Sequence, residues 1–128
     1  MTIATIAAIA VGGAVGAVSR HSVNQLAAHV LGAGFPWGTL IVNVLGSFLM
    51  GVIISSLAHF WQPPAAVKPM IVTGFLGAFT TFSTFSLDVA TLYERSAYLP
   101  MALYFLASVT FSIAALFAGM ILIRTLST

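Results

Sequence analysis

Four long apolar stretches, separated by short turn-forming segments, account for almost the whole chain. They cover residues 2–31, 36–60, 65–93 and 97–126. Glycine, proline or charged residues fill the turns between them. A helix needs about 20 apolar residues to cross the hydrocarbon core of a bilayer, and each stretch is long enough. The pattern predicts an all-α membrane protein: one transmembrane domain, residues 1–128, with four spanning helices.

The third stretch differs from the others in the middle. Between Gly74 and Ser86 it holds two glycines and five hydroxyl residues among its phenylalanines. Irregular backbone inside a membrane is tolerated only where protein or a water-filled cavity satisfies its polar groups. We therefore predict a helix that is broken at mid-membrane depth and lines an ion site, as in discontinuous transporter helices. The alternative is a continuous helix that packs through its small residues.

Composition agrees with a lipid-facing surface. The chain is 60% hydrophobic and 5% charged, with a mean hydropathy of +1.12. Soluble domains are roughly 25% charged, because a solvated surface needs that polarity. The apolar start has no preceding positive charge, so we interpret it as a retained first helix rather than a signal peptide. No run of Lys or Arg could bind nucleic acid.

The four basic residues are divided evenly between the two sides of the predicted membrane. Lys68 and Arg124 fall on the side of the two termini, and Arg20 and Arg95 on the other. Because excess Lys and Arg on one side is what orients a membrane protein, this chain should insert in both directions. A small chain of dual topology is a natural candidate for an antiparallel homodimer with a two-fold axis.

Enzyme chemistry lacks its usual residues. There are no cysteines, and the three histidines are too scattered for a metal site. Asp88 and Glu94 are six residues apart and would not share a helix face. No phosphate-binding loop or nucleophile–base pair is present. We expect a protein that is not an enzyme.

Polar residues inside the apolar stretches are the candidates for function, because burying them without a partner is costly. Asn43 has Thr39 and Ser47 one helical turn away on either side. Its amide could donate to an anion or make an interhelical hydrogen bond, and the sequence leaves both open. In the fourth stretch a hydroxyl residue recurs every four positions, which favours a polar track: Tyr104, Ser108 and Ser112.

Four phenylalanines crowd the predicted break: Phe75, Phe79, Phe82 and Phe85. Such residues usually fill a core. An aromatic ring, however, has a positive edge, which can host an anion without a fixed positive charge.

Three stretches together make the sequence identifiable. They extend from Gly12 to Arg20, from Pro36 to Phe48 and from Thr73 to Ser86. With them the chain resembles the Fluc/CrcB family of fluoride channels over essentially its whole length. Two positions depart from the family pattern: Asp88 stands where a glutamate is expected, so no role is carried over to it, and Ala78 where a third glycine is common.

The resemblance implies passive fluoride export across the bacterial cytoplasmic membrane, through two pores in an antiparallel homodimer. It implies that the path is lined by the Asn43 amide, the ring edges of Phe82 and Phe85, the track of Tyr104, Ser108 and Ser112, and Thr39, with Arg20 near the aqueous vestibule. It also implies a structural sodium ion at the dimer centre, held by the backbone carbonyls of Gly77 and Thr80.

Two other classes of protein share some of these features. A small four-helix multidrug transporter also inserts in both directions, but it needs a carboxylate in the membrane, typically in the first helix. The first stretch here contains no Asp or Glu. A non-catalytic assembly subunit would explain the glycines, but not Asn43 together with the hydroxyl track.

Overall fold

The computed structural model describes residues 1–128 and is entirely helical. Its elements are α1 (Ile3–Leu31), α2 (Trp37–His59), α3 (Val67–Pro69), the π-helical η1 (Met70–Leu76), α4 (Gly77–Phe79), α5 (Phe82–Glu94) and α6 (Tyr98–Leu126). The four short elements from α3 to α5 follow one another as a single span, Val67–Glu94. The chain thus has four helices long and apolar enough to cross a membrane, as the hydropathy pattern predicts.

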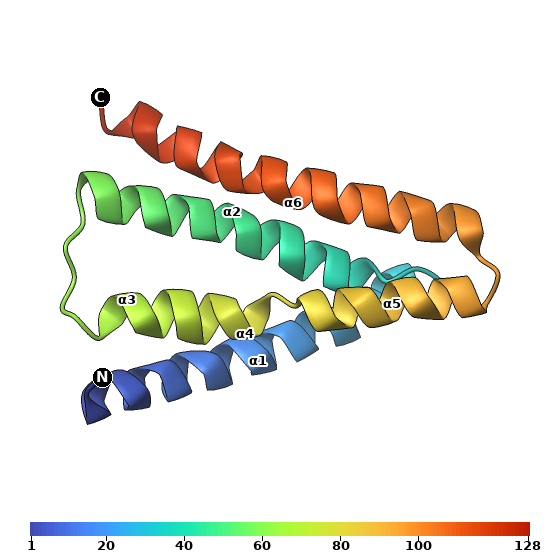
Figure 1. Cartoon of the computed structure of the whole chain (residues 1–128), viewed down its shortest axis with the longest axis horizontal. Coiled ribbons are helices and arrows are strands. Elements are labelled where there is room, and N and C mark those ends of the chain that lie inside the picture. Colours follow the sequence, from blue (N-terminus) through green and yellow to red (C-terminus); the bar gives the residue numbers. More distant parts are fainter.

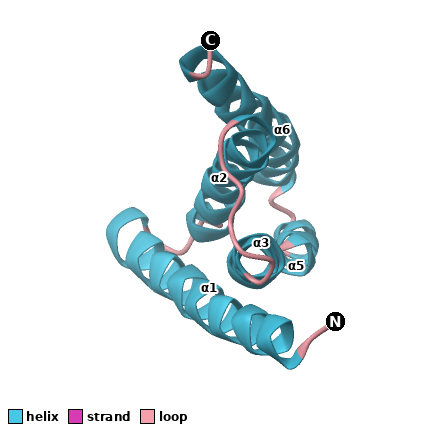
Figure 2. Ribbon diagram, turned by 90° about the vertical axis from the view of Figure 1, so that its left-hand side faces the viewer, coloured by secondary structure: helices cyan, strands magenta, loops and turns pink.

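The spans lie side by side, with both termini and the α2–α3 connection at one end of the molecule (Figure 1). Viewed toward that end, α2 occupies the middle, with α6 on one side and α1 and the third span on the other (Figure 2). α2 contacts every other span, whereas α6 contacts only α2 and α5. The arrangement is therefore open, because α1 and α6 do not meet.

Glycines let the helices approach closely. Gly12 and Gly16 of α1 lie against the backbone of η1, and a Cβ on Gly16 would collide with the backbone of Phe75. Gly51 and Gly119 bring α2 and α6 together in the same way. In lipid, where apolar side chains gain little by leaving their surroundings, such backbone proximity drives helix association. Gly12 and Gly16 are thus packing residues, and their spacing of four is the one that lets helix backbones approach closely in lipid.

The third span is interrupted by two residues in extended conformation. Thr80 has φ −88° and ψ 159°, and Thr81 has φ −156° and ψ 119°. α4 ends before them at Phe79, and α5 begins after them at Phe82. The Thr81 hydroxyl caps α5 by accepting a hydrogen bond from the Thr84 N–H at 3.1 Å. The segment rich in glycine and hydroxyl groups therefore contains the break, at its two adjacent threonines.

Candidate functional site

Asn43 of α2 lies beside the break and bonds to it at both ends of its side-chain amide. Its Nδ2 donates to the Thr81 carbonyl at 3.0 Å, and its Oδ1 accepts from the Thr81 N–H at 2.8 Å. Of the two roles that the sequence leaves open, the structure therefore contains the interhelical hydrogen bond. The amide has two N–H groups and uses one of them here, so the other is available to a ligand.

The break also changes the partners of two carbonyl groups. In a continuous helix the Thr81 N–H would donate to Gly77 and the Thr84 N–H to Thr80. Here the Thr81 N–H donates to Asn43, and the Thr84 N–H to the Thr81 hydroxyl. The carbonyl oxygens of Gly77 and Thr80 receive no backbone hydrogen bond outside the helical ladders either. Two carbonyl acceptors are thus left open, on the residues to which the resemblance assigns sodium.

A hollow of about 370 Å³ lies between α2, the break and α6. Five of the residues expected along the fluoride path line it: Asn43, Phe82, Phe85, Ser108 and Ser112. Ser47 and both residues of the break contribute to the same wall. The structure thus brings together side chains from three spans that are far apart in the sequence.

Ser108 and Ser112 stand out in this hollow because their hydroxyl oxygens are buried and have no hydrogen-bond partner. A serine in a helix commonly bonds back to its own backbone, and Ser22 of α1 does so at 2.8 Å. An unpaired buried hydroxyl costs about 1–3 kcal/mol, so each instance calls for an explanation. A polar ligand in the hollow would satisfy both groups.

The two phenylalanines of the hollow have different surroundings. Phe85 is 6% exposed and packs against Tyr104 with ring centroids 5.3 Å apart. Phe82 is 78% exposed in the single chain, and its ring lies 5.6 Å from that of Phe85. Phe75 and Phe79 stack on each other instead and do not line the hollow. Only two of the four phenylalanines are therefore placed to meet an ion there.

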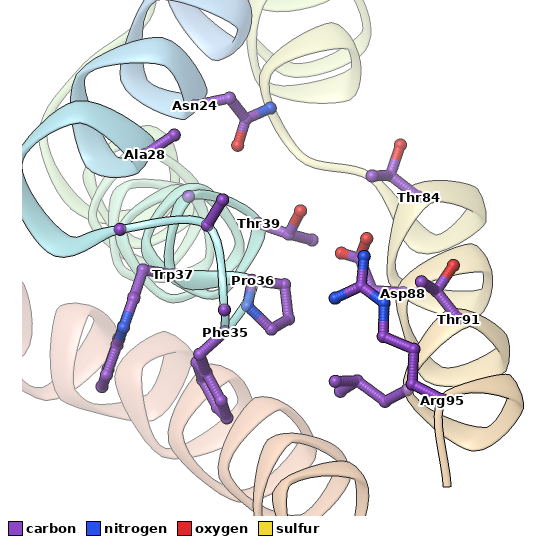
Figure 3. A pocket seen from close by; sticks show the side chains of 15 residues that line it. Asn24, Ala28, Phe35, Pro36, Trp37, Thr39, Thr84, Asp88, Thr91 and Arg95 are labelled. Carbon is purple, nitrogen blue, oxygen red and sulfur yellow. The ribbon is translucent and has the colours of Figure 1, made fainter. Parts of the chain in front are cut away.

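A second hollow, of about 320 Å³, lies where the α1–α2 connection meets α5 (Figure 3). Thr39 lines this hollow rather than the first, together with Asn24, Asp88 and Arg95. In Figure 3 the side chain of Arg95, the residue that follows α5, extends toward Asp88. The hollow has one basic and one acidic side chain in an otherwise mixed lining.

Tyr104 and Asp88 connect the second hollow to the track on α6. The Tyr104 hydroxyl donates to Asp88 Oδ2 at 2.9 Å, and Tyr104 is fully buried. It lies one helical turn before Ser108 but lines neither hollow. No role for Asp88 was predicted from the sequence. A lone carboxylate inside an apolar span was the only available signal, since its partner is 16 residues away.

Arg20 is not brought to either hollow. It lies on α1, which packs against α2 and the first half of the third span and does not contact α6. Arg95 is the basic residue that lines a hollow in the single chain. The vestibule position that the resemblance implies for Arg20 stays a prediction.

Comparison with known proteins agrees with this architecture. The family described as "CrcB-like protein, Camphor Resistance (CrcB)" matches residues 7–120. This chain belongs to the CrcB family. A fluoride-specific ion channel FluC of Rhodospirillum centenum is 50% identical over 120 residues, which are 94% of this chain and 95% of that protein. The FluC of Agrobacterium fabrum is 48% identical over 121 residues, which are 94% of this chain and 97% of that protein. The family resemblance noted in the sequence is thus confirmed.

Proposed function

We propose that this CrcB-family chain is a fluoride-selective channel that lets the ion flow passively out of a bacterial cell. The observation that carries the proposal is the first hollow, which is lined by two serines with unpartnered hydroxyls, an amide and two aromatic rings. Relatives that match nearly the full chain are fluoride-specific ion channels. The activity is conduction, so the chain is not an enzyme.

The first hollow suits a small, strongly hydrated anion. Selectivity requires groups that replace the water of the ion and still release it. Ser108 and Ser112 offer neutral donors, and the second N–H of Asn43 offers another. The positive ring edges of Phe82 and Phe85 would complete the shell. Several weak donors without a fixed positive charge hold fluoride loosely enough for it to leave.

The remainder of the path extends along α6 toward the second hollow. Tyr104 and Thr39 lie on this route, beyond Ser108. Arg20 attracts anions to an aqueous vestibule, and in the single chain Arg95 is already beside the second hollow. The break then lies at mid-membrane depth, where its polar groups are satisfied by protein and by the ion path.

The working form we propose is an antiparallel homodimer with two pores, embedded in the cytoplasmic membrane as a multi-pass protein. Only 20 of 128 residues are buried within the chain, and Phe82 is largely uncovered. A second copy would cover such surfaces. The even division of basic residues allows both orientations that this assembly needs.

A sodium ion at the dimer centre fits the residues present. The carbonyl oxygens of Gly77 and Thr80 have lost their helical partners, and in a membrane such backbone acceptors need another one. Hard cations take oxygen ligands of this kind. The bound ion would join the two chains and favour anions in the pores beside it.

The test is fluoride efflux from liposomes that contain the purified protein. We expect fluoride to leave down its gradient, with chloride retained under the same conditions. Efflux that needs a proton gradient, or export of aromatic cations without fluoride conduction, would contradict the proposal. The second result would favour a multidrug transporter, for which α1 lacks the usual carboxylate.

A further inference from the structure

We propose that Asn43 and Thr81 are positioning residues for the central cation: their side chains take the N–H groups that would otherwise occupy the Gly77 and Thr80 carbonyls. The inference rests on the sodium site of the proposed function. It gives Asn43 a role separate from contact with fluoride, and it gives Thr81 a role that the sequence did not indicate.

The first half of the argument concerns Gly77. Its carbonyl would accept from the Thr81 N–H if the helix continued. Asn43 Oδ1 accepts that N–H at 2.8 Å, while Nδ2 holds the Thr81 carbonyl at 3.0 Å. Two bonds to one residue fix both the position and the direction of its peptide groups. The side chain of α2 therefore keeps the third span open at this point.

The second half concerns Thr80. Its carbonyl would accept from the Thr84 N–H, but the Thr81 hydroxyl accepts that group at 3.1 Å. This is an ordinary N-cap, the first bond of α5, and such caps stabilise a helix by about 1 kcal/mol. Capping α5 at Thr81 thus also leaves the Thr80 oxygen open. Each of the two exposed carbonyls has a side chain that accounts for its exposure.

The side-chain amide of Asn43 serves both the cation site and the fluoride path. Its oxygen and one N–H are engaged by the break, and it lines the first hollow together with Thr80 and Thr81. The cation site and the anion path are therefore built against the same side chain. A substitution there should disturb both, unless it preserves the acceptor that Thr81 needs.

Sodium binding can be measured apart from fluoride flux. A ligand that binds only the folded state stabilises it by RT ln(1 + L/Kd), where L is the free ligand concentration, so the melting temperature rises once that concentration exceeds the dissociation constant Kd. Purified protein is unfolded thermally at a series of sodium concentrations, with N-methyl-D-glucamine replacing sodium at constant ionic strength. The readout is the sodium concentration at which the melting temperature begins to rise, and fluoride efflux from liposomes is recorded in parallel.

Asn43→Leu replaces the amide with an apolar side chain of similar size and removes both hydrogen bonds to Thr81. We expect the sodium concentration at which the melting temperature begins to rise to increase at least about tenfold, or the shift to disappear. Asn43→Asp retains an acceptor for the Thr81 N–H in either protonation state. We expect it to keep the sodium shift and to lose fluoride efflux.

Thr81→Val has nearly the same shape but no acceptor for the Thr84 N–H, and it should weaken sodium binding. Thr81→Ser restores the hydroxyl and should restore the shift. Phe82→Ile is the matched control from the same hollow, because it touches neither hydrogen bond. It should lower efflux and leave the sodium shift of the parent protein unchanged.

The outcomes separate this inference from the proposed function. An unchanged sodium shift in Asn43→Leu and Thr81→Val would overturn the inference, even if both variants melt at lower temperature. A parent protein that conducts fluoride without any sodium shift would also overturn it and leave the channel function standing. Absence of fluoride efflux from the parent, with the sodium shift present, would count against the channel alone.

Discussion

Ser108 and Ser112 lie one turn apart on α6, and both of their hydroxyl oxygens are buried without a hydrogen-bond partner. A group kept for packing would have found a partner, because an unpaired buried hydroxyl lowers stability. Substituting these two serines should therefore change fluoride conduction without lowering the stability of the fold. This makes the two serines the sharpest test of the first hollow.

We expect Ser108→Ala and Ser112→Ala to lower fluoride efflux by about tenfold each, the worth of one hydrogen bond to the ion. The same variants should unfold no more easily than the parent, since no bond within the protein is lost. Efflux from liposomes and thermal unfolding in detergent measure the two effects.

Ser55→Ala is the matched control. Ser55 is also buried, but its hydroxyl donates to the Met120 carbonyl at 3.3 Å and so joins α2 to α6. Its loss should lower the free energy of unfolding by about 0.6 kcal/mol and leave efflux intact. If both α6 variants conduct like the parent, the hydroxyls are not on the path.

Phe82 and Phe85 also allow effects on conduction to be distinguished from effects on stability, because only Phe85 is buried in the chain. Ile keeps apolar bulk and removes the positive ring edge, so Phe82→Ile and Phe85→Ile should both slow fluoride flux strongly. Phe85→Ile should lower the stability of the fold more than Phe82→Ile, by roughly 0.5–1.5 kcal/mol, because only Phe85 is buried and also loses the aromatic contact with Tyr104.

Phe75→Ile tests whether an aromatic ring outside the hollow also affects fluoride conduction. Phe75 stacks on Phe79 at 5.6 Å and does not line the hollow. The Phe75→Ile variant should therefore conduct fluoride as the parent protein does. Equal conduction by Phe82→Ile and the parent would instead show that ring edges do not contact the ion.

Much of the fold follows from local pattern. Each of the four spans is apolar for longer than a bilayer requires, and the glycines and hydroxyls of the third span mark it as irregular. The position of the break within that segment does not follow. It is fixed by Asn43, which lies 38 residues from its partner Thr81 in the chain. The Thr81–Thr84 cap could have been recognised, since Thr is a preferred N-cap residue.

Five of the residues expected along the path line one hollow, but the sequence did not indicate that Thr39 would line another. Thr39 and Asn43 are one turn apart on α2, which suggests one continuous wall. In the structure Thr39 lines the second hollow and Asn43 the first. The π-helical turn η1 has no local signal either, since it forms where α1 meets the third span through Gly12 and Gly16. Both features depend on contacts between distant parts of the chain.

Tyr104 and Asp88 lead to a prediction about stability. Tyr104→Phe removes the 2.9 Å hydrogen bond to the carboxylate and leaves that group without this donor. We expect the free energy of unfolding to fall by about 1.5–3 kcal/mol, the range for a hydrogen bond to a charged group. Asp88→Asn keeps an oxygen that can accept from Tyr104 and should retain most of the stability. Unfolding of both variants in detergent gives the comparison, and equal stability of Tyr104→Phe and the parent would show that this bond contributes little.

Orientation in the membrane is the last prediction, and it follows from the even division of basic residues. Reporters fused to the C-terminus, one active in the cytoplasm and one outside, should both give signal for the parent chain. Gln62→Lys with Ala65→Lys adds charge on the side of the termini, and Leu31→Lys with Glu94→Lys adds it on the other. All four positions are exposed. Because added lysines are retained in the cytoplasm, each pair should force a single and opposite orientation.

Each oriented variant alone should conduct fluoride poorly, since it lacks an antiparallel partner. Expressed together, the two should recover the flux of the parent, because each supplies the orientation that the other is missing. The control is a mixture of two samples of the same variant, which should not recover. Full activity from one oriented variant alone would rule out an antiparallel requirement, and a parent chain found in only one orientation would rule out dual topology.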